Sequence, residues 1–262
     1  MALSEVKRMP TFDLHSEKII LYGDWKIGKT SLVASMPFDV YFIAAEKGQS
    51  KVAFYGENAP DWTTFQSLVA EVKTSTKFKM ICIDTIDALW YLYLNHFNKV
   101  NNVTWEGDLK WGKGSALLVR GFIQEFMALQ HSGKGFFLLA HEKETIDAEG
   151  NGRIIPNLPQ DKENRIRDAI CGMCDYIIYM RMESMKNKDG LIVQQHVLRT
   201  APSEKYVAGA RHRLPDPIPL IEDDPAGSAA RLVNAYNKSA APVTAPATET
   251  KKENKANGTL GV

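Results

Sequence analysis

The chain has 262 residues, of which 44% are hydrophobic and 24% are charged. This composition is typical of a globular protein, and it excludes a chain that is disordered throughout, a collagen-like rod and a coiled coil. The 32 Lys and Arg residues nearly balance the 31 Asp and Glu residues. The chain as a whole is therefore not a polycationic nucleic-acid binder, although a local basic patch is compatible with this balance.

Cysteine content and hydropathy bear on the compartment. Three cysteines in the whole chain exclude a disulfide scaffold and fit a reducing environment. No apolar run approaches the roughly 20 residues that a membrane span requires, and the first residues lack the apolar core of a signal peptide. We therefore expect a soluble, cytoplasmic protein without a membrane partner.

Apolar runs and helical spacing alternate along the chain. Short apolar runs predict buried strands at 18–23, 40–45, 80–84, 135–140 and 176–182. Apolar residues at the helical period predict helices at 30–36, 62–74, 88–97, 116–130, 164–172 and 226–237. Turn residues predict one hairpin within 144–158 and a C-terminal β-hairpin in which the turn 187–190 precedes a strand at 191–198.

This alternation indicates an α/β fold with a mostly parallel central sheet that helices cover on both faces. We expect one domain over residues 18–238, after a leader at 1–17. The segment 239–262 contains Ala, Pro, Thr, Lys and Glu with almost no large apolar residue, which predicts a disordered tail. Ligands of such sheets bind at the carboxyl ends of the strands, so the residues that follow each strand are the candidate site.

The first strand leads into the pattern G-x-x-x-x-G-K-[ST] at residues 23–30, the Walker A pattern. Its glycines allow successive backbone N–H groups to face a phosphate, and the following helix adds its positive end. Lys29 is expected to reach the β- and γ-phosphates of ATP, and the Thr30 hydroxyl to bind Mg²⁺. The alternative is a turn with an incidental lysine. The expected nucleotide-binding residues are Gly23, Asp24, Trp25, Lys26, Ile27, Gly28, Lys29, Thr30 and Ser31.

A P-loop enzyme also needs a carboxylate near Mg²⁺ at the end of a neighbouring strand. Asp84 ends the apolar run 80–84, where an unpaired charge would be costly. We therefore expect Asp84 to be a second Mg²⁺ ligand, alongside Thr30. It could also cap the helix that follows.

Hydrolysis requires a group that orients or activates water. Many P-loop ATPases have a glutamate directly after the strand-terminal aspartate, but Thr85 stands there in this chain. Glu46 instead ends the second strand, and in this respect the chain resembles the RecA-like ATPases. That resemblance implies that Glu46 is the catalytic base; a surface glutamate at a strand exit is the alternative.

The resemblance implies two further roles. His141 follows the fourth strand, where RecA-like proteins place a γ-phosphate sensor, although a histidine could also simply end the strand. Lys205 and Arg211 lie in the basic segment 196–214. They are the candidates for a residue that reaches the γ-phosphate of a neighbouring subunit, with a solvated basic face as the alternative.

The segments that carry the resemblance occur in the same order as in RecA-like ATPases of bacteriophages, including those that act in single-strand annealing and recombination. They are KIILYGDWKIGKTSL (18–32), VYFIAAEKG (40–48), MICIDTIDALW (80–90), FFLLAHE (136–142) and LRTAPSEKYVAGARHRLP (198–215).

The resemblance covers about residues 18–220. It implies a RecA-like fold, ATP and Mg²⁺ as cofactors, a DNA-stimulated ATPase activity, and a role in phage recombination, annealing or replication within the host cytoplasm. It also implies single-stranded DNA, a single-strand-binding protein and copies of the same chain, in a ring or filament, as partners. The chain lacks a strongly basic DNA loop, which leaves two alternatives: a P-loop small-molecule or nucleotide kinase, and an ATP-driven assembly factor without direct DNA contact.

Overall fold

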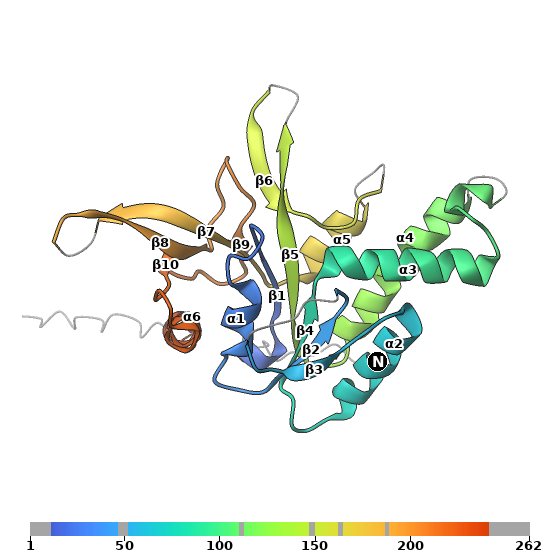
Figure 1. Cartoon of the computed structure of the whole chain (residues 1–262), viewed down its shortest axis with the longest axis horizontal. Coiled ribbons are helices and arrows are strands. Elements are labelled where there is room, and N and C mark those ends of the chain that lie inside the picture. Colours follow the sequence, from blue (N-terminus) through green and yellow to red (C-terminus); the bar gives the residue numbers. More distant parts are fainter. Residues whose placement is uncertain are drawn as a thin grey trace, which may run out of the picture.

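A computed structural model describes residues 12–46, 52–109, 113–146, 150–161, 165–186 and 189–240. Its centre is a sheet in the order β10-β8-β7-β1-β5-β4-β2-β3 (Figure 1). The strands from β7 to β3 in this order run parallel, whereas β8 pairs antiparallel with both β7 and β10. The expected α/β fold with a mostly parallel sheet is confirmed. The strands are β1 (Lys18–Gly23), β2 (Val40–Ala44), β3 (Tyr55–Asn58), β4 (Met80–Asp84), β5 (Gly135–Ile146), β6 (Gly152–Pro156), β7 (Tyr176–Lys186), β8 (Ile192–Arg199), β9 (Gly209–Ala210) and β10 (Ile218–Pro219).

Helices cover both faces of the sheet and enclose one hydrophobic core on each side. Helices α1 and α6 pack on one face, and the other long helices pack on the opposite face (Figure 1). Alternate residues of β1 point to different faces: Ile20 and Tyr22 enter one core, while Ile19 and Leu21 enter the other. The helices are α1 (Lys29–Ala34), α2 (Trp62–Thr74), α3 (Ile86–Asn101), α4 (Lys113–Gln130), α5 (Arg165–Met173) and α6 (Pro225–Ala240), with short 3₁₀ turns η1 (Leu14–Ser16) and η2 (Glu106–Asp108).

The strand register aligns the carboxyl ends of β1, β2 and β4 with the middle of β5. Gly23 at the end of β1 lies beside His141 in β5, and Ala44 near the end of β2 lies beside Asp84 at the end of β4. Parallel strands place their carboxyl ends at one edge of the sheet. The residues that follow β1, β2 and β4 therefore converge there with His141 of β5.

Several elements differ from the sequence-based expectation. Strand β5 runs to Ile146, well beyond 140, because its second half pairs with β6; this pairing is the expected hairpin, which projects from the sheet (Figure 1). Helix α3 begins and ends outside 88–97. Strand β3 was not predicted, because its sequence YGEN is short and polar.

The predicted boundaries at both ends are moved slightly. The turn η1 lies within the expected leader 1–17, and α6 continues two residues past 238. Residues 1–11 and 241–262, which hold the rest of the leader and tail, lie outside the described residues. In the part of the chain that is described, no helix combines the length and the apolar character needed to cross a membrane.

Candidate functional site

The loop between β1 and α1 turns sharply at the carboxyl edge of the sheet. Lys26 and Gly28 have positive φ angles of 59° and 104°, a region that favours glycine. At Gly23 an added Cβ would lie 2.2 Å from the carbonyl oxygen of Met180 in β7. Only glycine lets β1 lie this close to β7 and still release the chain into the loop.

Lys29 lies at the start of α1, and its side chain turns back into the loop. It is buried, and its Nζ donates hydrogen bonds to the carbonyl oxygens of Gly23 at 2.9 Å and Asp24 at 2.8 Å. Burial lowers the pKa of Lys29, whereas Asp84 and other nearby carboxylates oppose this shift. The loop therefore holds a desolvated ammonium group where the Walker A pattern predicts a phosphate contact.

Thr30 and Asp84 meet directly, as expected for two ligands of one metal ion. The Thr30 hydroxyl donates a hydrogen bond of 2.7 Å to Oδ2 of Asp84. Burial raises the pKa of Asp84, although the bond from Thr30 and the charge of Lys29 lower it. A hydroxyl and a carboxylate are hard oxygen ligands of the kind that Mg²⁺ prefers, so the donor set fits Mg²⁺.

Glu46 lies just beyond β2 and is held from the neighbouring strand. Its Oε1 accepts a hydrogen bond of 2.8 Å from the hydroxyl of Thr85, which is buried directly after β4. The position after Asp84 is thus occupied by a residue that holds Glu46 in place. This arrangement places a carboxylate next to the Thr30–Asp84 pair.

His141 is fixed by two neighbours. Its Nδ1 lies 2.9 Å from Oδ2 of Asp87 in the first turn of α3, and its ring stacks on Trp25 with a centroid separation of 3.6 Å and an interplanar angle of 16°. Potential ligand atoms of Glu46, Asp87 and His141 lie within 4.8 Å of one another. The end of β2, the first turn of α3 and the middle of β5 therefore bring two carboxylates and an imidazole close together.

Apart from Asp87, the side chains described above line one cavity of about 450 Å³. Its volume is in the range of sites for small ligands. Gly23 and Asp24, which are expected nucleotide contacts, are not among its lining residues; their carbonyl oxygens accept the hydrogen bonds from Lys29. The lining residues are Trp25, Lys26, Ile27, Gly28, Lys29, Thr30, Ser31, Phe42, Ala44, Glu46, Val52, Phe54, Asp84, Thr85 and His141.

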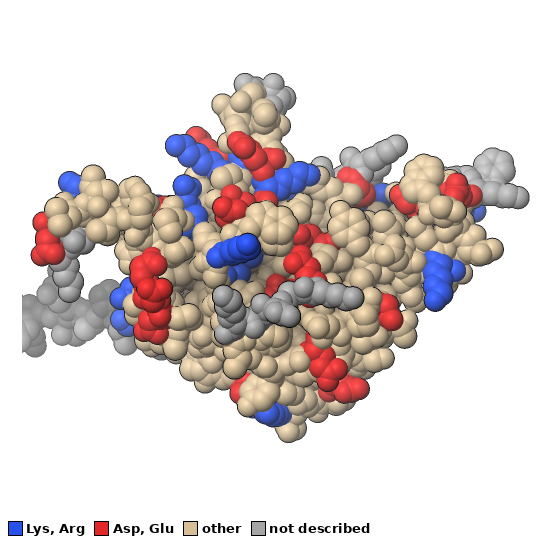
Figure 2. All heavy atoms as spheres, in the orientation of Figure 1, with Lys and Arg blue, Asp and Glu red and all other residues tan. Residues whose placement is uncertain are grey.

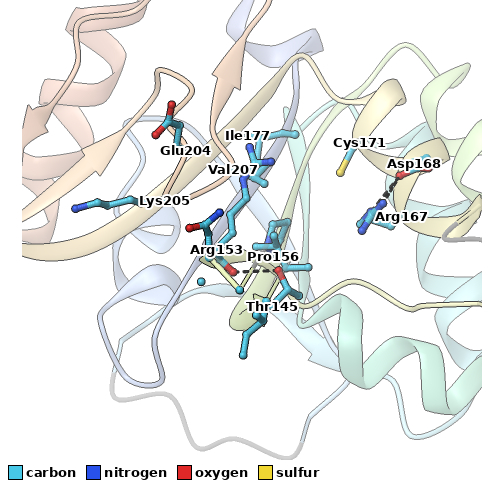
Figure 3. A pocket seen from close by; sticks show the side chains of 15 residues that line it. Thr145, Arg153, Pro156, Arg167, Asp168, Cys171, Ile177, Glu204, Lys205 and Val207 are labelled. Carbon is cyan, nitrogen blue, oxygen red and sulfur yellow. Dashed lines mark hydrogen bonds and ion pairs between the residues drawn. The ribbon is translucent and has the colours of Figure 1, made fainter. Parts of the chain in front are cut away.

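Lys205 and Arg211 are not brought to this cavity within the chain. Lys205 borders a separate cavity of about 1240 Å³ between the β5–β6 hairpin and α5, and its side chain points away from Arg167 on the opposite wall (Figure 3). Nε of Arg211 forms an ion pair of 2.7 Å with Asp175, which precedes β7 at the other edge of the sheet. Their expected role toward a neighbouring subunit stays a prediction.

Two polar residues of the site were missed by the sequence-based interpretation, namely Thr85 as the partner of Glu46 and Asp87 as the partner of His141. The signal was present in Asp84-Thr85-Ile86-Asp87, because residues in the first turn after a strand face the same edge as the strand end. The spacing along the chain does not, however, predict which side chains of the neighbouring strands Thr85 and Asp87 contact.

A protein-family model described as an AAA domain matches residues 15–212, which span β1 to β9 and every residue of the site. The chain belongs to the AAA domain family. A search of curated proteins found no match. Membership of this AAA family indicates a P-loop ATPase-type domain that binds a nucleotide, typically with Mg²⁺.

Proposed function

We propose that this AAA-family protein binds ATP with Mg²⁺, hydrolyses it in a RecA-like manner, and acts on single-stranded DNA in phage recombination, annealing or replication. The observation that carries the hydrolysis step is the convergence of Lys29, the Thr30–Asp84 pair and the Thr85-held Glu46 on one cavity. The single-stranded DNA and phage context is supported by the sequence resemblance and belongs to the proposal.

The proposed roles follow from the contacts of each side chain. The ammonium of Lys29 exchanges its loop carbonyls for phosphate oxygens, while Thr30 and Asp84 hold Mg²⁺. The metal ion, when bound, neutralises charge that develops on the phosphates. Glu46 accepts a hydrogen bond from the attacking water and orients it, and Thr85 fixes the direction of the Glu46 carboxylate.

His141 completes the proposed constellation. Because Asp87 occupies its Nδ1, the other ring nitrogen, Nε2, is the one left to contact the γ-phosphate. In this role His141 senses whether the γ-phosphate is present. Its stacking on Trp25 links this contact to the loop that holds the other phosphates.

The charge distribution fits a modest affinity for nucleic acid rather than a strong one. Acidic and basic side chains are interspersed over the face shown in Figure 2, in line with the net charge of +1. DNA binding by phosphate contacts alone scales with the number of basic groups that reach the backbone. We therefore expect DNA contact to depend on assembly or on a partner such as a single-strand-binding protein.

The test is ATP turnover measured with and without single-stranded DNA, double-stranded DNA and nucleoside monophosphates. Stimulation by single strands supports the proposal, whereas phosphate transfer to a monophosphate selects the kinase alternative. Hydrolysis that none of these additions changes selects the assembly-factor alternative. Lys29→Ala is expected to abolish turnover, and unchanged turnover in this variant would contradict the P-loop assignment.

A further inference from the structure

A second cavity adjoins the nucleotide cavity and shares two of its walls. It has a volume of about 540 Å³, enough for one nucleoside-sized ligand. Trp25 and Glu46 line both cavities. The remaining walls come from the start of α3, from β5 and from the segment after β6: Asp87, Ala88, Trp90, Tyr91, Lys143, Asn157, Leu158, Pro159 and Gln160.

Three aromatic rings face this second cavity. Trp25 and Tyr91 are 64% and 65% exposed, although large aromatic side chains are usually buried on folding. Trp90 is partly buried, and its ring packs edge-on against Phe122 in the core with a centroid separation of 5.0 Å. A rigid ring beside two exposed rings provides surfaces on which a planar ligand can stack.

The polar groups of the cavity indicate what kind of planar ligand fits. Glu46 and Asp87 place two carboxylates against the single ammonium of Lys143, which disfavours a phosphate in the cavity itself. Oδ1 of Asp87 is buried and has no hydrogen-bond partner among the described residues. Lys143 and Gln160 form a 3.0 Å hydrogen bond at the wall. These groups can pair with the amino, imino and carbonyl groups of a heterocycle.

We propose that this second cavity binds an unstacked nucleobase, with Tyr91 and Trp25 as its stacking surfaces. Trp25 also stacks on His141, so a base packed against Trp25 restrains the imidazole that faces the nucleotide cavity. Base binding is thereby expected to stimulate ATP hydrolysis. The stimulation rests on the function proposed above, whereas the binding itself does not.

The experiment measures binding of a short fluorescent oligothymidylate to the full chain by anisotropy, for the wild-type protein and three variants. Tyr91→Ala is expected to weaken binding about five- to 150-fold, the range found when a stacked aromatic is truncated. Tyr91→Phe keeps the ring and is expected to bind within about twofold of the wild-type protein. Tyr55→Ala removes an exposed tyrosine of β3, outside the cavity, and serves as the matched control. Turnover without nucleic acid should be the same for Tyr91→Ala and the wild-type protein.

Competition identifies the source of the base. Competition by an unlabelled oligothymidylate but not by thymidine monophosphate assigns the cavity to a single strand, and competition by the monophosphate assigns it to a free nucleotide; both support the inference. An abasic strand should compete at least tenfold less well than oligothymidylate.

Three outcomes would overturn the inference. The first is equal binding by Tyr91→Ala and the wild-type protein, the second is an equal loss in Tyr91→Ala and Tyr55→Ala, and the third is that neither the oligothymidylate nor thymidine monophosphate binds. If binding depends on Tyr91 while ATP turnover is absent, the proposed ATPase function fails and the base site stands.

Discussion

At the scale of single residues, the site concentrates charges that the fold itself does not favour. Asp84 and Lys29 are both partly removed from water. Burial raises the pKa of Asp84 and lowers the pKa of Lys29, and in each case it favours the neutral form. Mutual attraction and the hydrogen bonds from Thr30 and to the loop carbonyls offset part of this cost. A partly desolvated ammonium and carboxylate are suited to a ligand that supplies both the negative charge of phosphates and the positive charge of a metal ion.

Asp84→Asn tests this balance. The pKa of Asp84 is raised in the folded protein, which therefore holds the carboxyl proton more tightly than the unfolded chain does. Stability is consequently lost as the pH rises from the unfolded-state pKa through the folded-state pKa and Asp84 ionises. At neutral pH and without metal, Asp84→Asn is expected to raise the thermal midpoint by a few degrees, and the gain should shrink at acidic pH.

The same substitution removes a proposed Mg²⁺ ligand. We expect Mg²⁺-dependent turnover by Asp84→Asn to fall at least tenfold. Calorimetric melts over a pH series, together with a turnover assay, measure both effects. A variant that is less stable at every pH would show that Asp84 is a stabilising ion-pair partner rather than a group kept for function.

Glu46→Gln separates nucleotide binding from hydrolysis. The amide can still accept the hydrogen bond from Thr85 but is a far weaker base than the carboxylate, so we expect ATP affinity within about threefold of the wild-type protein and turnover lowered by a factor of about 10² or more. Equilibrium binding of a fluorescent ATP analogue and steady-state turnover measure the two quantities. Glu57→Gln in β3 is the control, and normal turnover by Glu46→Gln would refute its role as the base.

At the scale of elements, the phosphate loop depends on how tightly β1 packs between β5 and β7. Both neighbours pair with β1 along its length, and at Gly23 the backbone of β7 leaves no room for a Cβ. The loop therefore starts from a strand that is anchored on both sides. Its geometry is set by the sheet as much as by its own glycines.

Gly23→Ala is expected to disturb both packing and binding. The new methyl group would lie 2.2 Å from a backbone oxygen of β7, which must move, so we expect a loss of about 1–3 kcal/mol of stability and at least tenfold weaker ATP binding. Chemical denaturation and nucleotide titration measure these changes. Gly172→Ala in α5, where the added carbon meets nothing within 4 Å, should be neutral or slightly stabilising; equal behaviour of the two variants would contradict the close-packing argument.

At the scale of the whole molecule, candidate catalytic groups line two separate cavities of the same domain. The nucleotide cavity lies at the carboxyl edge of the sheet, whereas Lys205 borders the cavity beneath the β5–β6 hairpin. Lys205 does not line the nucleotide cavity of its own chain, so its proposed catalytic role is one toward a neighbouring copy. This geometry makes the expected ring or filament testable.

Mixing two inactive variants tests catalysis between subunits. Lys205→Ala lacks the proposed donor and Glu46→Gln lacks the proposed base, so each alone should hydrolyse ATP at least tenfold more slowly than the wild-type protein. In a mixed assembly, Lys205 of one copy can serve the intact site of the next, and turnover should recover to a substantial fraction of the wild-type value. Turnover of the mixture equal to the average of the two variants would argue against a role of Lys205 between copies.

Local patterns were sufficient to predict most helices and strands and to name the candidate groups of the site. The helix Trp62–Thr74 and the strands Lys18–Gly23 and Met80–Asp84 were predicted with the bounds that the structure shows, because hydrophobic periodicity and turn residues act over a few positions. The phosphate loop was readable for the same reason: its spacing is fixed along the chain.

Only the tertiary structure decided which side chains meet. The pairing of Thr85 with Glu46, the position of Asp87 beside His141 and the ion pair of Arg211 with Asp175 all join residues that are far apart along the chain or on different elements. The order and register of the strands set these contacts. The sequence by itself therefore determined a P-loop α/β protein and its candidate groups, whereas the packing of the sheet determined which residues those groups contact. The reason is that these contacts depend on which strands lie side by side, and no local sequence pattern specifies the order of the strands.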